Sequence, residues 1–223
     1  MKKVIITIAL FAVASSSVSA EGNYESGVKM GVIAGTTGFG IEVAKPLSEN
    51  WNFRFHGTGG DLDKSFIKSD IQYDADLKLT NIGALVDWYA GGSIFRVTGG
   101  GFYTKNKFNV TASLVSNENA IGNNTYTSIE AGSLIGSIET GNEIAPYFGI
   151  GFGKRADSDD RLGVSIDLGV MYTGSPKVSL TADGLLASES TFMSDLDEEE
   201  RNISSSNYFK VYPVTSIGIT YKF

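Results

Sequence analysis

The sequence predicts an all-β protein: an antiparallel up-and-down transmembrane β-barrel, most simply of eight strands. Three observations lead to this prediction. The chain begins with an export signal, eight later segments alternate large apolar residues with small or polar ones, and the last segment ends on an aromatic residue. Successive side chains of a strand point to opposite faces, so these segments present an apolar outside and a polar inside.

The first twenty residues predict a cleaved signal peptide. Two lysines form a basic start, Val4 to Ala14 is an almost wholly apolar run, and Val18-Ser19-Ala20 matches the small-residue cleavage pattern. The apolar run is too short for a transmembrane helix, which needs about 20 apolar residues. We therefore expect cleavage after Ala20, with residues 21–223 forming the barrel.

The composition argues against several classes of protein. Cleavage removes two of the 18 basic residues, which leaves 16 against 25 acidic residues and a net charge of −9. A chain this acidic is not expected to bind nucleic acid, whose phosphates require clustered lysine and arginine. There is no cysteine, which excludes disulfides, thiolate metal sites and a cysteine nucleophile. No cofactor, metal or catalytic site is predicted.

The alternation defines the membrane strands. It is clearest from Leu162 to Tyr172, where Leu, Val and Ile residues alternate with Gly, Ser and Asp. Such segments, with small residues on one face, are typical of narrow barrels, whose interiors hold small side chains. The eight segments are residues 28–34, 39–44, 51–56, 82–88, 95–103, 148–153, 162–172 and 216–223.

The connections between these segments differ in length. One set of alternate connections comprises residues 48–50, 90–93 and 154–161, and the other set, mostly longer, comprises residues 35–38, 59–71, 104–143 and 173–209. If both chain ends are periplasmic, the short turns are periplasmic too and the long loops lie outside the cell.

Two of the loops are too long to lack structure. Within 104–143, the apolar stretches 108–114 and 128–138 either extend strands above the membrane or add a hairpin that makes ten strands. Within 173–209, Ser194 and Asp197 resemble a helix capping box, which predicts a short acidic helix over residues 195–201.

The parity of the segments sorts side chains into outward and inward sets. Outward aromatic residues near the segment ends match an interfacial girdle: Trp51, Trp88, Tyr103 and Tyr172. The inward set places these titratable residues in the lumen: Lys29, Glu42, Arg54, His56, Asp87, Arg96, Asp167 and Lys222. Charges buried in a narrow barrel must pair, so we expect an ion-pair network between strands. A gated or permanently wet path through the lumen is the alternative.

The final segment points to a family. Ile217, Ile219, Tyr221 and Phe223 alternate toward a terminal aromatic residue. This pattern resembles the signal by which outer-membrane barrels reach their insertion machinery. Together with the export signal and the eight segments, it makes the chain similar to the small bacterial outer-membrane β-barrel superfamily of OmpA-type, OmpX-like and OmpW-like barrels. The resemblance is one of pattern along the mature chain, and no peptidoglycan-binding domain is expected after the barrel.

The resemblance implies a location in the bacterial outer membrane, with its lipid and lipopolysaccharide as partners and the insertion machinery bound through the C-terminal strand. We expect a non-enzymatic barrel with a structural or surface-interaction role carried by loops 104–143 and 173–209, toward a surface ligand not identified by sequence. One alternative is a narrow channel for small or apolar solutes. A second is a membrane-embedded lipid-modifying enzyme that uses His56, the only histidine.

Overall fold

The computed structural model describes residues 27–68, 71–92, 94–114, 119–121, 124–156 and 158–222. The predicted signal peptide, its cleavage site and Phe223 lie outside the described residues. Within the described ranges, no helix is long and apolar enough to cross a membrane.

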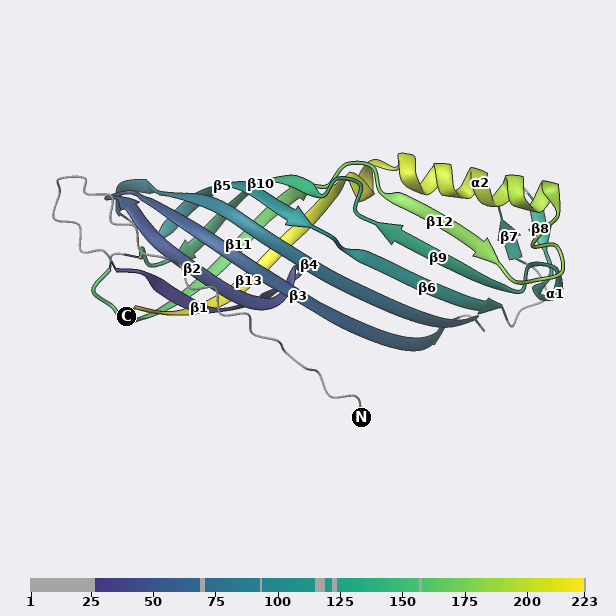
Figure 1. The fold of residues 1–223 in the computed structure, drawn as a ribbon, viewed down its shortest axis with the longest axis horizontal. Coiled ribbons are helices and arrows are strands. Elements are labelled where there is room, and N and C mark those ends of the chain that lie inside the picture. The colour runs from purple at the N-terminus through teal and green to yellow at the C-terminus, as the bar shows by residue number, and fades with distance from the viewer. Residues whose placement is uncertain are drawn as a thin grey trace.

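Eight antiparallel strands close into a barrel, as predicted (Figure 1). They are β1 (Lys29–Gly35), β2 (Gly38–Ser48), β3 (Trp51–Lys68), β4 (Ile71–Tyr89), β5 (Phe95–Thr104), β10 (Ile144–Gly153), β11 (Leu162–Tyr172) and β13 (Val211–Lys222). The ring runs in that order, and β13 pairs with β1 to close it. The predicted stretches around 108–114 and 128–138 do not enter the ring, so the ten-stranded alternative is wrong.

The predicted parity holds around the ring. Along β11 and β13 the large aliphatic residues are exposed on the outside of the barrel, while Gly, Ser and Asp alternate with them on the inside. The same alternation of buried and exposed residues runs without a break from Asn81 to Tyr89 on β4. The barrel is therefore apolar outside and polar inside, which is the reverse of a water-soluble β-protein.

The connection predicted over residues 59–71 is mostly strand. β3 and β4 pair with each other as far as Lys68 and Ile71, well beyond the ring. The alternation simply continues in this hairpin, because Leu62 and Phe66 lie across from Leu77 and Tyr73. The expectation of a loop here is wrong, since the period of two extends past the membrane segment.

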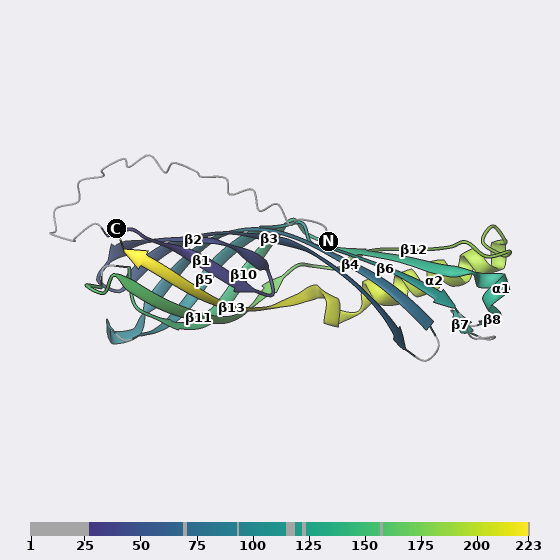
Figure 2. The same ribbon diagram turned by 90° about the horizontal axis from the view of Figure 1, so that it is seen from below.

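Three further strands widen this hairpin into a sheet outside the barrel. They are β6 (Lys107–Leu114), β9 (Ser133–Glu139) and β12 (Lys177–Ala182), in the order β3-β4-β6-β9-β12. We call this sheet, with the elements packed on it, the extension. Figure 2 shows it continuing the barrel along the long axis of the molecule. The barrel end that holds the start of β1 and the end of β13 is called the terminal end.

The remaining elements are β7 (Asn119–Ile121), β8 (Asn124–Tyr126), α1 (Ser128–Ala131) and α2 (Ser190–Ser205), with two short 3₁₀ turns, η1 (Ala90–Gly92) at the terminal end and η2 (Asn207–Lys210) before β13. Of these, β7, β8 and α1 lie at the end of the extension farthest from the barrel, and α2 runs along β12 (Figure 1). The acidic helix is confirmed, but it begins five residues earlier than predicted. Its cap is Glu189, whose side chain accepts from the backbone N–H of Phe192. The four acidic residues 197–200 therefore lie inside the helix and not in its first turn.

A second hydrophobic core holds the extension together. Buried side chains from β7, β8, α1 and α2 meet there: Ile121, Tyr126, Ala131, Phe192 and Leu196. Leu134, Leu180, Ala182 and Leu186 pack against them. The two long loops thus fold on each other, which explains how both are accommodated outside the barrel.

Asp195 fixes α2 to the β7–β8 hairpin. Its carboxylate accepts hydrogen bonds from the Tyr126 hydroxyl at 2.5 Å and the Asn124 amide at 2.8 Å. These donors, Tyr126 first, lower the pKa of Asp195 below its ordinary value of 3.8. Because the pKa of Asp195 is lower in the folded state, its carboxylate stabilises the contact between α2 and the β7–β8 hairpin at every pH above the ordinary pKa. This stabilisation is lost as the pH falls through the folded-state pKa.

We expect the extension to become more sensitive to protease as the pH falls below about 4, where a carboxylate with an ordinary pKa protonates on unfolding. Limited digestion with pepsin from about pH 2 to about pH 5 measures this. Asp195→Asn should flatten the dependence, since asparagine does not titrate. An unchanged profile in that variant would assign the acid sensitivity to another group.

Candidate functional site: the closed lumen

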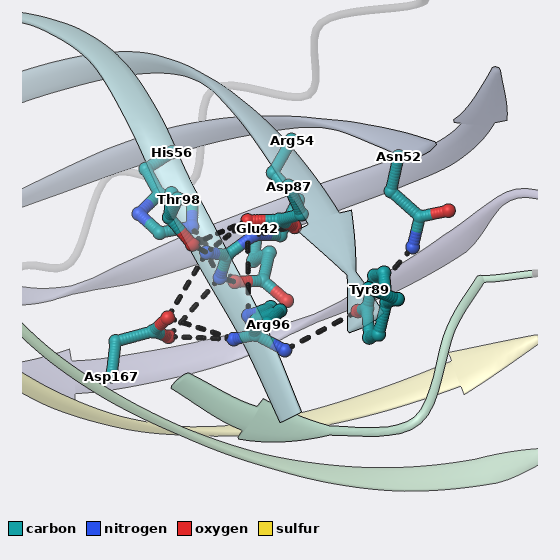
Figure 3. A network of polar contacts seen from close by, with 9 residues as sticks. All are labelled: Glu42, Asn52, Arg54, His56, Asp87, Tyr89, Arg96, Thr98 and Asp167. Atoms are coloured by element: carbon teal, nitrogen blue, oxygen red, sulfur yellow. Dashed lines mark hydrogen bonds and ion pairs between the residues drawn. The ribbon is translucent and has the colours of Figure 1, made fainter. Parts of the chain in front are cut away.

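Six of the predicted lumen residues meet in one hydrogen-bonded network (Figure 3). They are Glu42 on β2, Arg54 and His56 on β3, Asp87 on β4, Arg96 on β5 and Asp167 on β11. All six are buried, each with at most 5% of its surface exposed. Parity in the strands brings these charges inside, and the closure of the ring brings them together.

Arg54 is the centre of this network. Its guanidinium donates to Asp167 at 3.0 and 3.1 Å, to Asp87 at 2.9 Å and to Glu42 at 3.1 Å. β3 and β11 are four steps apart in either direction around the eight-stranded ring. The contact between Arg54 and Asp167 therefore crosses the full width of the lumen.

Arg96, on β5, also binds Asp167 in this charged layer. It holds Asp167 with two hydrogen bonds of 2.8 and 2.9 Å from one nitrogen. Thr98 completes the layer by donating to Asp87 at 2.7 Å. Gly151 leaves the space that this packing needs, because a Cβ there would lie 2.7 Å from the Asp167 carboxylate and 2.9 Å from Arg96.

An apolar layer lies on the extension side of the charges. It consists of buried residues from five strands: Leu85, Phe102, Ala145, Tyr147, Met171 and Val214. The rings of Phe102 and Tyr147 meet edge to face at 5.4 Å, and Phe102 also contacts the His56 ring. Gly83 makes room for Phe102, since a Cβ at Gly83 would lie 2.5 Å from that ring.

The two remaining lumen lysines lie nearer the terminal end. Lys29 donates to the Arg155 carbonyl at 2.8 Å and to the Ser158 hydroxyl at 2.6 Å, and Lys222 donates to the Ser158 carbonyl at 3.4 Å. Both thus hold the turn between β10 and β11 against the base of the barrel. A cavity of about 10 Å³ lies beside Lys29 and Arg54, which is room for a single water.

Sequence reasoning missed part of the site. Tyr89 is buried beside the network, and its hydroxyl accepts from Arg96 at 3.4 Å. Parity with Asp87 would have placed it inside, but the predicted segment stopped at Trp88. The apolar layer was also missed, because Phe102 and Tyr147 resemble ordinary strand residues until the ring brings them together.

The other predicted site residues lie on the outside of the barrel. Trp51 and Trp88 are exposed and directly paired near the terminal end, while Tyr103 and Tyr172 lie at the opposite ends of their strands. Ile217, Ile219 and Tyr221 of the predicted assembly signal all point outward from β13.

The chemistry available to His56 is limited by its neighbours. Its Nε2 lies 2.8 Å from Glu42 and 3.5 Å from Arg54, and its ring packs against Phe102. In the part of the chain that the structure describes, no group of three or more histidine or acidic side chains is arranged to hold a metal ion.

Comparisons with known proteins place the fold. No protein-family model and no curated protein matches the sequence. The crystal structure of Acinetobacter baumannii CarO2 is similar, with a TM-score of 0.71 and 25% identity over 89% of this chain and 99% of that one. Acinetobacter baumannii CarO gives 0.69 and 22% over 91% and 100%. A major outer membrane protein from Thermus thermophilus gives only 0.41 and 13% over 88% and 99%.

The two CarO structures establish the barrel fold, and nearly their whole length is covered. They do not identify the chain as OmpA-type, OmpX-like or OmpW-like. The supported assignment is therefore the coarser one, an outer-membrane type of β-barrel.

Proposed function

We propose that this protein is a non-enzymatic barrel of the bacterial outer membrane with a closed lumen, and that its extension contacts ligands outside the cell. The observation that carries the proposal is the contact between Arg54 and Asp167 across the whole lumen, with the Phe102–Tyr147 layer stacked on it. A barrel blocked twice in this way offers no path, so its contacts are made by what stands outside it.

The outer surface supports the membrane location. A belt of exposed aliphatic and aromatic side chains surrounds the barrel, and a water-soluble protein of this size rarely leaves such a belt uncovered. Paired Trp51 and Trp88 at one end, with Tyr172 at the other, fit the two aromatic girdles of a membrane barrel. With the terminal end in the periplasm, the extension lies outside the cell.

Single-channel conductance of the refolded protein in a planar bilayer tests the closed lumen. We expect no current, with folding verified by a shift in gel migration on heating and with a known porin as the control for insertion. Steady or gated current from the wild type would contradict the proposal and favour the channel hypothesis. Turnover of a lipid substrate that His56→Ala abolishes would instead favour the enzyme hypothesis.

A further inference from the structure

One face of the extension sheet is apolar. In the described structure, no other element packs on the half of this face that β3 and β4 form. The lumen-facing parity of β3 and β4 continues past the ring, so that Leu62 and Phe66 share a face with Leu77 and Tyr73. Phe108 on β6 lies beside Leu77 on that face. We call these five residues the apolar strip. The opposite face of the same strands carries mostly Asp, Lys, Ser, Thr and Asn side chains, with the exposed Ile67 as its apolar exception.

Helix α2 covers only the other half of this face. It packs over β12 and over the second hydrophobic core, where its Phe192 and Leu196 are buried. The side chain of Glu200 accepts a hydrogen bond from the backbone N–H of Leu180 on β12. Figure 1 shows α2 lying along β12, with the β3–β4 hairpin at the opposite edge of the same sheet. In the apolar strip, by contrast, Leu62 remains 57% exposed, Phe66 43% and Phe108 36%.

A cation lies within the strip. Lys64 is on the same face as Leu62 and Phe66 and directly opposite Ala75. Two other lysines of the extension are paired: Lys78 with Asp76 and Lys107 with Glu139. Among the described residues, Lys64 makes no ion pair or hydrogen bond. The strip therefore combines an extended apolar surface with one unneutralised positive charge.

Two of the registers in which a second copy of this chain could pair with the open edge of β3 are unfavourable. Antiparallel pairing of two β3 edges about a two-fold axis places residues of the same face opposite each other. An axis at Lys64 opposes the two lysines, and an axis at Asp63 opposes the two aspartates, each destabilising. A charge pointing inward from an edge strand has this protective effect in many sheets.

We propose that the strip binds a long-chain fatty acid, with the hydrocarbon chain on the apolar side chains and the carboxylate paired with Lys64. The Lys64 ammonium group matches the single charge of one carboxylate, whereas a phosphate monoester carries about −1.5 to −2 at neutral pH. The face runs about 20 Å from the level of Leu79 to Tyr73, at ~3.4 Å per residue, which accommodates an extended acyl chain. This inference rests on the proposed function in one respect, that the extension is the part that contacts ligands.

Photo-crosslinking with a diazirine-bearing palmitate tests the proposal. The full-length protein is refolded into zwitterionic lipid nanodiscs, and labelled peptides are identified by mass spectrometry. We expect labelling in residues 62–77 that unlabelled palmitate suppresses and hexadecanol suppresses less. Lys64→Gln should lower the labelling about threefold, as for an exposed charge pair. Phe66→Ser should lower it about tenfold through lost apolar contact.

The matched control is Lys78→Gln, a lysine of the same hairpin on the polar face, which should leave labelling unchanged. Equal labelling in Lys64→Gln and the wild type would overturn the proposal. So would equal competition by hexadecanol, or self-association of Lys64→Gln with unchanged labelling, which would assign Lys64 to edge protection alone. Conductance is measured on the same preparation. A conducting barrel with a labelled strip overturns only the proposed function, and a silent barrel without a labelled strip overturns only this inference.

Discussion

Replacing Arg54 with alanine should lower the free energy of unfolding by about 3–5 kcal/mol, the usual effect of removing one partner from a buried ion pair. The reason is that Glu42, Asp87 and Asp167 then remain inside the barrel without their shared cation. Urea unfolding in lipid vesicles measures the change. The two tryptophans report it, because both are exposed on the outside of the barrel near its terminal end.

Arg201→Ala is the matched control, since Arg201 is exposed on α2, and it should change stability by less than about 0.5 kcal/mol. A double-mutant cycle separates the network from a general loss of packing. Arg54→Ala should cost less in an Asp167→Asn background, because one of the stranded charges is then absent. Identical unfolding midpoints for Arg54→Ala and the wild type would show that the network does not stabilise the barrel.

Replacing Phe192 with alanine should unfold the extension while the barrel survives. Phe192 is fully buried in the second core, and its ring meets Tyr126 edge to face at 4.8 Å. Truncating a buried phenylalanine costs about 3–5 kcal/mol, which is a large share of the stability that so small a core provides. Limited trypsin digestion should therefore cut the variant between residues 105 and 143 or between residues 173 and 210, leaving the barrel strands and their heat-dependent gel shift intact.

Phe209→Ala provides the comparison, because Phe209 is half exposed in η2 outside that core, and its digestion should match the wild type. If Phe192→Ala also loses the heat-dependent gel shift, barrel and extension fold as one unit. That result would contradict the separation of the two cores.

The barrel was predictable because a strand has a strict period of two. Lipid outside and a narrow interior impose opposite demands on alternate residues, so the local pattern alone indicates which residues face inward. This is why Arg54, Asp87 and Asp167 were placed in the lumen from parity alone. The cost of burying an unpaired charge, several kcal/mol, then predicted that these charges would pair with one another.

The extension was predicted less well, for two reasons. Polar residues between Gly59 and Ile71 resemble a loop, yet their alternation is that of a hairpin whose outer face meets water. The start of α2 was misplaced because the Ser194–Asp197 pattern occurs inside the helix, while the cap is a glutamate, a less typical capping residue.

The sequence by itself located the eight segments of the barrel, their apolar outer face and the set of charges inside, because each depends only on alternation between neighbouring residues. It left a ten-stranded barrel open. The tertiary structure alone decided that Arg54 reaches Asp167, that Phe102 and Tyr147 pack edge to face beside that contact, and that Leu62 and Phe66 remain exposed. These contacts join residues that lie far apart in the chain. They depend on ring closure, register and the path of the long loops, which the order of residues along one strand does not specify.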